Sequence, residues 1–408
     1  MKTIAQFLFV YTCFISIQLN AQGTQQTSFL YQIGIKETIQ SKVLGEQRDI
    51  WVQVPPNANA YDRFPVVYVL DGEEQMSALA ATHNYYWGHH LPKMILVGIS
   101  NRENRNRDLT PSKVKGIKTG GAEKFTEFIE QELIPYIDEE YPTTAHRTLI
   151  GHSHAGLFAI NTFVNHTNLF NNYIAIDPSL YWDDQKFLKE TLKKIDQAKF
   201  ENKSLFVSLA SPLDRSNESV GIDEVMKTES PHSVLARSIL TLCNALESNP
   251  SEDLRFSWKY YPDDIHGTVP LLSMIDGLRY CFEWYQLKDA SVLNNPETPV
   301  EKLQEMIKQR ALMLSKHFGY PVPPADEEFL TMGAQMYHQM GQVDKINLFL
   351  SSAAEFYPKS EEAQSNLAEF YFQTKQPNKA IEYLEKAYEL SGNEQYKQKI
   401  QEAKSMNK

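Results

Sequence analysis

The order of apolar and polar positions predicts strands and helices that alternate through most of the chain. Short apolar runs rich in β-branched and aromatic residues, bounded by Gly, Pro or Asp, are typical of buried strands. These runs lie at residues 48–55, 64–72, 93–100, 148–151, 172–177, 204–210 and 254–262. Apolar residues spaced three and four apart predict helices at 125–141, 156–165, 233–247 and 268–287. The alternation indicates an α/β fold, a doubly wound and mostly parallel sheet with helices on both faces.

The C-terminal part of the chain is predicted to be helical throughout and to contain a repeat. At an offset of 34 residues, Ala334 aligns with Ala368, and Tyr337 aligns with Tyr371. Small residues let paired helices approach, and larger ones fill the seam between them. The pattern resembles tetratricopeptide repeats, with an ordinary helical hairpin as the alternative. Such a tail would dock a partner protein or support self-association.

The N-terminus has the pattern of a secretory signal peptide. Lys2 gives a positive start, residues 4–17 are largely apolar, and the following LNAQ offers a small residue for cleavage. We therefore expect export, to the periplasm or the medium. An uncleaved anchor is the alternative, although the apolar stretch is shorter than the roughly 20 residues that a span requires. The expected organisation is a signal peptide (1–21), an α/β domain (28–287), a proline-containing connecting region (288–326) and a repeat tail (327–408).

Charge and cysteine content exclude several classes of function. The chain of 408 residues has a formal net charge of -11, with acidic and basic residues mixed. An acidic surface argues against nucleic acid as a ligand, because phosphate binding needs a basic patch. Cys243 and Cys281 lie in apolar helical segments and are expected to be buried thiols. There is no cysteine–histidine spacing typical of a metal site, and no cofactor is implied.

The segment GHSHA (residues 151–155) follows a predicted strand and precedes a predicted helix. This is the context of a nucleophile elbow, G-x-S-x-G, in which small residues flank a very sharp bend. The bend would lift the Ser153 hydroxyl off the sheet edge and direct the His154 N–H at a developing oxyanion. Ala155 takes the place of the final glycine, and Gly156 follows one residue later. Ser153 is the expected nucleophile.

A serine nucleophile needs a base, normally a histidine that is held by an acid. In sheets of this kind the chain order is serine, acid, histidine. His266 follows the last predicted strand, in a loop at the carboxyl end of the sheet, where ligand sites lie. It is the expected base, whereas His232 is placed near a helix start.

Several carboxylates meet the requirement for the acid. Asp214 is preferred, because it follows the strand predicted at 204–210. Glu218 in the same loop and Asp177 at the end of the preceding strand are alternatives. A Ser–His dyad without an acid also stays open, because the acid only orients and stabilises the imidazole.

The loop after the strand at 64–72 is expected to supply the second oxyanion donor. Asp71 and Gly72 turn the chain there, so the N–H of Glu73 would point into the site together with that of His154. Tyr181 and Trp182 are expected to line the substrate pocket. Aromatic walls of this kind suit aryl esters such as catecholates or ferulates.

These segments come in an order that resembles a known family. RDIWVQVPP, FPVVYVLDG, RNRDLTP, the elbow, DPSLYWDD and YYPDDIHGTVP are together similar to the putative-esterase family of α/β-hydrolases, over residues 28–287. That family includes siderophore esterases, relatives of S-formylglutathione hydrolase, and feruloyl or acetyl esterases. The resemblance implies an α/β-hydrolase fold, Ser153 as nucleophile and His266 as base, with main-chain oxyanion donors at His154 and near Glu73. Asp177 stands where relatives commonly carry a small residue. The siderophore-esterase branch, in which a dyad can suffice, is the most similar.

The sequence therefore predicts an exported serine hydrolase that cleaves a small-molecule carboxylic ester through an acyl-enzyme. One alternative is an inactive hydrolase-fold scaffold that binds a partner through its helical tail. Another is acyl transfer to an alcohol, which differs from hydrolysis only in the access of water.

Overall fold

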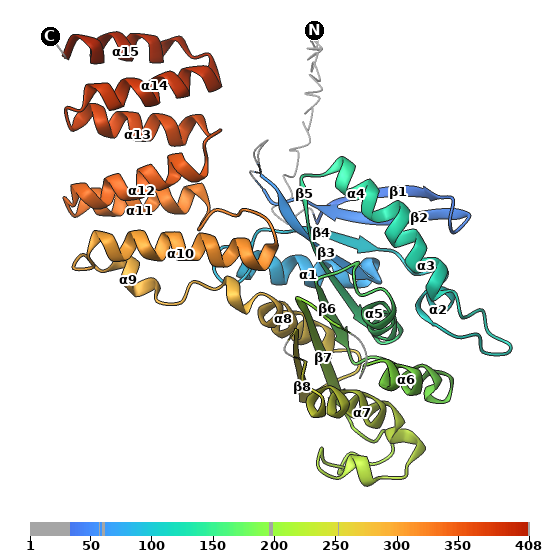
Figure 1. The fold of residues 1–408 in the computed structure, drawn as a ribbon. Coiled ribbons are helices and arrows are strands. Elements are labelled where there is room, and N and C mark those ends of the chain that lie inside the picture. The colour runs from blue at the N-terminus through green and yellow to red at the C-terminus, as the bar shows by residue number, and fades with distance from the viewer. Residues whose placement is uncertain (1–32, 57, 59–61, 196–198, 252, 407–408) are drawn as a thin grey trace, which may run out of the picture. The chain divides into compact units, whose positions relative to one another are not determined.

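An eight-stranded, mostly parallel sheet organises the α/β part of the chain (Figure 1). The strand order is β1-β2-β4-β3-β5-β6-β7-β8, and only the pairs β1–β2 and β2–β4 are antiparallel. The strands are β1 (Ile35–Ser41), β2 (Glu46–Gln53), β3 (Phe64–Leu70), β4 (Ile95–Ile99), β5 (Thr143–His152), β6 (Asn172–Ile176), β7 (Lys203–Ser211) and β8 (Leu254–Ile265). The predicted α/β fold is confirmed. Among the strands, the pattern missed only the edge strand β1, most of whose side chains are polar and exposed or half-buried. It also did not predict the helices Gly72–Tyr86, Arg105–Leu109 and Trp182–Ile195.

The computed structural model describes residues 33–406 except 57, 59–61, 196–198 and 252. The predicted signal peptide, residues 1–21, lies outside the described residues. Among the residues that are described, no helix has the length and apolar character needed to cross a membrane. Cys243 and Cys281 are buried and free, which confirms their prediction as buried thiols.

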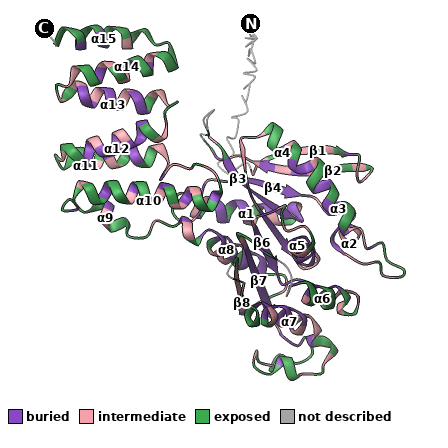
Figure 2. Ribbon diagram, viewed as in Figure 1, coloured by how far each residue is buried: buried purple, intermediate pink, exposed green. Residues whose placement is uncertain are grey.

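Helices cover both faces of the sheet. They are α1 (Gly72–Tyr86), α2 (Arg105–Leu109), α3 (Ala122–Phe128), α4 (Ile134–Glu140), α5 (His154–Asn165), α6 (Trp182–Ile195), α7 (Val234–Ser248) and α8 (Val269–Cys281). α1 and α8 pack together on one face, while α5, α6 and α7 follow one another on the other. The middle strands are consequently buried on both sides (Figure 2), as in β3, β4 and β6, where every residue is buried. Burial on both faces is why these strands appear in the sequence as unbroken apolar runs.

The helix predicted at 125–141 is divided into three parts. A π-helical turn at Ile129–Leu133 separates α3 from α4. Pro135 follows this turn. A proline has no N–H, and its ring clashes with the carbonyl four residues earlier, so the regular α-helical hydrogen bond cannot form there. This accounts for the π-helical turn.

The C-terminal part is entirely helical in the described residues. Its helices are α9 (Ala290–Asn294), α10 (Val300–Phe318), α11 (Glu327–Gln339), α12 (Val343–Phe356), α13 (Glu361–Gln373), α14 (Pro377–Ser391) and α15 (Glu394–Met406). α11 and α13 begin at residues 327 and 361, which reproduces the offset of 34 residues, and the aligned residues Ala334, Ala368, Tyr337 and Tyr371 are all buried. The tetratricopeptide interpretation itself stays a prediction.

The region predicted as a connection contains α9 and the long helix α10. Its prolines lie outside α10 rather than within it: Pro299 caps the start, and Pro321 follows the end. Proline is tolerated at both places because it cannot continue a helix from within. The prolines thus bound a helix on both sides, and the prediction that residues 288–326 connect two domains stays a prediction.

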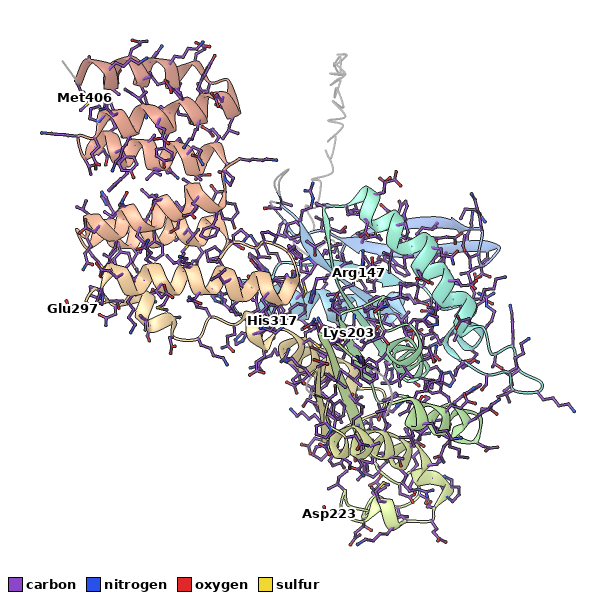
Figure 3. All side chains as sticks on the ribbon, viewed as in Figure 1. Arg147, Lys203, Asp223, Glu297, His317 and Met406 are labelled. Atoms are coloured by element: carbon purple, nitrogen blue, oxygen red, sulfur yellow. The ribbon has the colours of Figure 1, made fainter. Side chains whose placement is uncertain are left out.

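The helical part contacts the amino-terminal ends of the parallel strands. Phe318 packs edge-on against His146 of β5, at 5.2 Å between ring centroids, and His317 stacks on Trp284 at 4.4 Å. Figure 3 labels His317 at the end of α10 near Lys203, the first residue of β7. These contacts lie at the end of the sheet where the parallel strands begin, opposite to their carboxyl ends.

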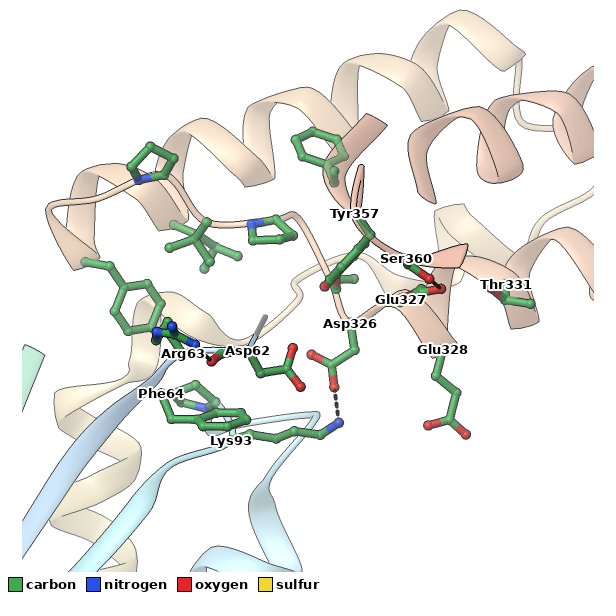
Figure 4. Close-up of a pocket in the computed structure, with 18 of the residues that line it drawn as sticks. Asp62, Arg63, Phe64, Lys93, Asp326, Glu327, Glu328, Thr331, Tyr357 and Ser360 are labelled. Atoms are coloured by element: carbon green, nitrogen blue, oxygen red, sulfur yellow. Dashed lines mark hydrogen bonds and ion pairs between the residues drawn. The ribbon is translucent and has the colours of Figure 1, made fainter. Parts of the chain in front are cut away.

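A cleft of about 1570 Å³ opens at the same edge (Figure 4). Phe64 and Lys93 line it from the strand side, and Asp326 and Tyr357 line it from the helical side. An ion pair of 3.0 Å between Lys93 Nζ and Asp326 Oδ2 crosses it. No predicted site residue of the described chain lines this cleft.

The buried aromatic contact should hold this junction far more strongly than the ion pair. We expect Phe318→Ala to lower the free energy of unfolding by about 3 kcal/mol or more, through lost burial and a cavity. Lys93→Ala should cost less than about 1 kcal/mol, because both charges are partly exposed. Chemical denaturation of the two variants compares them directly. Equal losses would contradict this account of the junction.

Candidate functional site

Ser153 occupies a strained turn between β5 and α5. Its backbone angles are φ 61° and ψ -117°, which side-chain-bearing residues rarely adopt and which cost about 1–3 kcal/mol. The end of β6 holds the turn on two sides. The Ser153 N–H donates to the Ile176 carbonyl at 2.9 Å, and the Ser179 N–H donates to the Ser153 carbonyl at 3.0 Å. The turn therefore presents the Ser153 hydroxyl at the carboxyl edge of the sheet.

Two close approaches explain the small residues around Ser153. A Cβ at Gly151 would lie 2.1 Å from the Ala155 carbonyl oxygen, so no side chain fits there. A Cβ at Gly156 would lie 3.0 Å from both the Ile176 carbonyl oxygen and Pro178. The second tight position is thus Gly156, which is why Ala155 is accommodated where the motif usually has glycine.

His266 contacts the carboxylate of Asp177. The distance from His266 Nδ1 to Asp177 Oδ2 is 2.6 Å, and the other carboxylate oxygen accepts the Ala210 N–H at 3.0 Å. Asp177 is 1% exposed, whereas the His266 side chain is 36% exposed. With Nδ1–H donated to Asp177, the Nε2 atom of His266 is left as the proton acceptor.

The carboxylate beside His266 is therefore not that of Asp214, which the sequence favoured. Asp214 Oδ1 accepts hydrogen bonds from the Ser216 backbone and hydroxyl at 2.8 and 2.7 Å. The hydroxyls of Ser216 and Ser230 lower the pKa of Asp214 to about 2. Asp214 thus organises its own loop, and the alternative Asp177 makes the contact with His266. The other alternative, Glu218, is exposed in the Asp214 loop.

The two predicted oxyanion donors lie at neighbouring helix starts. β3 and β5 are adjacent in the sheet, and α1 and α5 begin directly beyond them. His154 is the first residue of α5, and Glu73 is the second of α1. The first N–H groups of a helix have no partner within it, and the helix dipole makes this end favourable for negative charge. Their role as an oxyanion hole stays a prediction.

Arg105 ties these two helix starts together. Its guanidinium donates to both carboxylate oxygens of Asp71, at 2.9 and 2.8 Å, and to the His152 carbonyl at 3.2 Å. Asp71 precedes α1, and His152 precedes the Ser153 turn. A bidentate arginine fixes orientation as well as distance, so the two loops are held in register.

Two further histidines flank Ser153 in the sequence, and one of them contacts His266 while the other contacts Trp182. The His152 ring lies 4.5 Å from that of His266, and the His154 ring packs edge-on against Trp182 at 5.1 Å. Burial lowers the pKa of His152 to about 4, and burial followed by the charge of Arg105 does the same for His154. Both rings are neutral at neutral pH. The structure thus places Trp182 against a site residue, while Tyr181 is its half-buried neighbour.

Sequence reasoning missed three residues of this site. Arg105 was part of the motif RNRDLTP but had no role assigned, and Asn106 lies 3.2 Å from His154 Nδ1. Ser179 Oγ lies 3.2 Å from Ser153 Oγ. The available signal for Ser179 was its position two residues after Asp177, at a strand end next to the nucleophile strand. In the part of the chain that the structure describes, no cluster of His, Cys, Asp or Glu has the arrangement to hold a metal ion.

Comparison with known proteins links the α/β part to esterases. Residues 41–218 match the model of a family described as "Putative esterase". The siderophore triacetylfusarinine C esterase of Aspergillus fumigatus is 27% identical over 239 residues, covering 54% of this chain and 82% of that protein. Ferri-bacillibactin esterase BesA of Bacillus subtilis is 37% identical over 93 residues, which cover 22% of this chain and 32% of the relative.

Solved structures extend the likeness. An IroE-like serine hydrolase from Shewanella oneidensis matches with a TM-score of 0.65 and 27% identity, covering 79% of this chain and 99% of its own. An uncharacterised protein from Capnocytophaga ochracea matches with a TM-score of 0.57 and covers 91% of this chain and 99% of its own. At 19% identity this second match shows a shared fold alone, which extends into the helical part.

The buried histidines of the site give a testable pH dependence. At pH 5 the rings of His152 and His154 should remain neutral, whereas histidine with its ordinary pKa of 6.5 would be mostly charged. The unfolded chain then binds more protons than the folded chain, so stability should fall as the pH is lowered from about 6.5 towards 4. ¹⁵N NMR of the ring nitrogens, assigned with His152→Gln and His154→Gln, measures the charge. A charged ring at pH 5 would refute the assigned burial.

Proposed function

Because the α/β part of this chain belongs to the putative-esterase family of α/β-hydrolases, we propose that the protein is a serine hydrolase that cleaves a carboxylic ester. The observation that carries the proposal is the contact between His266 Nδ1 and the buried carboxylate of Asp177. It lies beside a serine in the strained backbone conformation of a nucleophile elbow. This is the arrangement in which a histidine becomes a general base.

Acylation begins with the proton of Ser153 Oγ. His266 Nε2 accepts this proton while Oγ forms a bond to the ester carbonyl carbon. The N–H groups of His154 and Glu73 stabilise the negative charge on the carbonyl oxygen. His266 then returns its proton to the departing alcohol as the ester C–O bond breaks, which leaves the acyl group on Ser153.

Deacylation repeats these steps with water. A water molecule loses a proton to His266 Nε2 and attacks the acyl carbon. The bond to Ser153 Oγ then breaks, and His266 returns the proton to that oxygen. Asp177 keeps its negative charge throughout and stabilises the imidazolium ion formed in each half of the reaction.

In the structure the Ser153 hydroxyl contacts Ser179 rather than His266. The proposed mechanism therefore requires a rotation of the Ser153 side chain towards His266 when substrate binds. Such loosening of catalytic hydrogen bonds before substrate arrives is usual, because the complex tightens them.

We infer an ester of the siderophore type as the substrate. The printed functions of two relatives, a triacetylfusarinine C esterase and a ferri-bacillibactin esterase, support this class. The aromatic ring of Trp182 beside His154 suits a planar acyl or aryl group. The signal-peptide pattern of residues 1–21 supports action outside the cytoplasm, in the periplasm or the medium.

Removal of the nucleophile tests the reaction class. Ser153→Ala should lose more than about 10³-fold of the p-nitrophenyl butyrate turnover of the full-length chain. It should also lose covalent labelling by a fluorophosphonate, with an unchanged circular dichroism spectrum. Hydrolysis of a cyclic catecholate siderophore ester, compared with a feruloyl ester by mass spectrometry, tests the substrate class. Equal turnover or labelling in both proteins would refute Ser153. Absence of both in the unmodified protein would favour an inactive scaffold.

The acid can be identified with a matched pair of substitutions. Asp177→Asn should lower kcat by about 10²–10⁴-fold, because the wrong His266 tautomer is then favoured. Asp214→Asn should change kcat less than about threefold, because Asp214 bonds its own loop. Steady-state kinetics with p-nitrophenyl butyrate distinguishes them. The reverse order of effects would restore Asp214 as the acid.

A further inference from the structure

Ser179 presents a buried hydroxyl to the proposed nucleophile. Its Oγ lies 3.2 Å from Ser153 Oγ, and the residue is only 2% exposed. Among the described residues, Ser153 Oγ is the one hydrogen-bond partner of the Ser179 hydroxyl. A buried hydroxyl without a partner is costly, and this contact supplies the Ser179 hydroxyl with one.

The backbone around Ser179 is fixed on both sides. Its N–H donates to the Ser153 carbonyl at 3.0 Å, and its carbonyl accepts the Trp182 N–H at 3.1 Å. Pro178 packs tightly against Gly156 of α5, where an added Cβ would lie 3.0 Å from the proline. The backbone that carries the Ser179 side chain is therefore held at a set place relative to the Ser153 turn.

The topology places Ser179 on the same side of Ser153 as His266. β5, which ends at the nucleophile, lies between β3 and β6 in the sheet. Glu73 follows β3, whereas Ser179 follows β6 and His266 follows β8. Ser179 therefore approaches Ser153 from the side opposite the Glu73 oxyanion donor, and it is not a further member of that pair.

We propose that Ser179 is a further catalytic residue, which donates a hydrogen bond to Ser153 Oγ in the acyl-enzyme and promotes deacylation. The inference rests on the proposed function. Once Ser153 is acylated, its Oγ carries no hydrogen and can only accept, so a maintained contact makes Ser179 the donor. In the resting enzyme either hydroxyl can donate the hydrogen bond to the other. In the acyl-enzyme only Ser179 can be the donor.

A donor at this oxygen assists one half of the reaction. In deacylation the bond between the acyl carbon and Ser153 Oγ breaks, and its electron pair goes to Oγ. The Ser179 hydrogen bond withdraws electron density from this ester oxygen, which makes the acyl carbon more open to water and stabilises the charge that develops as Oγ departs. His266 then delivers the proton to Oγ, and Ser179 keeps its own. In acylation Oγ needs its electron pair for attack, so the same donor gives no comparable help.

Pre-steady-state kinetics of Ser179→Ala with p-nitrophenyl butyrate tests this asymmetry. We expect the rate constant of the p-nitrophenol burst, which reports acylation, to change less than about twofold. The deacylation rate constant should fall about tenfold, as expected for the loss of one hydrogen bond to a charge-bearing oxygen. Because deacylation would limit turnover, kcat and KM should fall together and kcat/KM should stay nearly constant.

Two variants serve as controls. Ser238→Ala removes an equally buried hydroxyl, one that bonds the Val234 carbonyl within α7, and should leave both rate constants unchanged. Ser179→Cys keeps a weak donor of similar size and should recover part of the deacylation rate, which also covers the case in which Ser179→Ala does not fold.

The outcomes separate this inference from the proposed function. A normal burst with unchanged deacylation in Ser179→Ala would overturn the role of Ser179 and leave Ser153 as nucleophile. An equal loss in acylation and deacylation would show a merely structural role and would also overturn it. If the unmodified protein gives neither a burst nor fluorophosphonate labelling, the proposed function fails, and the role of Ser179 fails with it.

Discussion

Two backbone hydrogen bonds between the Ser153 turn and the end of β6 support the rest of the site. They hold a serine in a backbone conformation that costs about 1–3 kcal/mol, and at about 0.5–1.5 kcal/mol each they offset a comparable amount. The same stretch of chain continues directly into Asp177 and Ser179. One strand end therefore fixes the turn, supplies the carboxylate that contacts His266, and places a hydroxyl beside Ser153. The close packing of Pro178 on Gly156 is what allows the strand end to come so near.

The position of the proposed acid, Asp177, follows from the neighbours of the strand that precedes it. β6 lies between the strand that ends at Ser153 and the strands β7 and β8, and His266 follows β8. The N–H of Ala210, in β7, binds one oxygen of Asp177 and orients the other towards His266. A carboxylate after β7, such as Asp214, was the expected acid. In the structure, however, the Asp214 carboxylate accepts a hydrogen bond from the Ser216 hydroxyl in its own loop. An acid that only orients an imidazole can come from any strand end within reach of its Nδ1, so strand number is a weak guide.

The candidate site and the contacts between the helical part and the sheet lie at opposite ends of the strands. Ser153, Asp177 and His266 lie at the carboxyl ends of parallel strands, whereas His146 and Lys93, which meet Phe318 and Asp326, lie at the amino ends. His146 and Ser153 are seven residues apart along β5 and the turn after it, or about 23 Å of extended strand. The length of the parallel strands therefore lies between the candidate site and the contacts of the helical part.

The sequence by itself determined the sheet, the elbow and the loop of His266. Strands buried on both faces must be apolar throughout, and a sharp turn with close backbone contacts must be built from small residues, so both leave local patterns. The polar edge strand β1 leaves no such pattern. Only the tertiary structure showed that Asp177, rather than Asp214, contacts His266, and only it brought Arg105 and Ser179 beside the Ser153 turn. All of these residues lie in loops at one sheet edge. Which side chain reaches which partner there depends on distances of a few ångströms between segments far apart in the chain, and residue spacing does not carry that information.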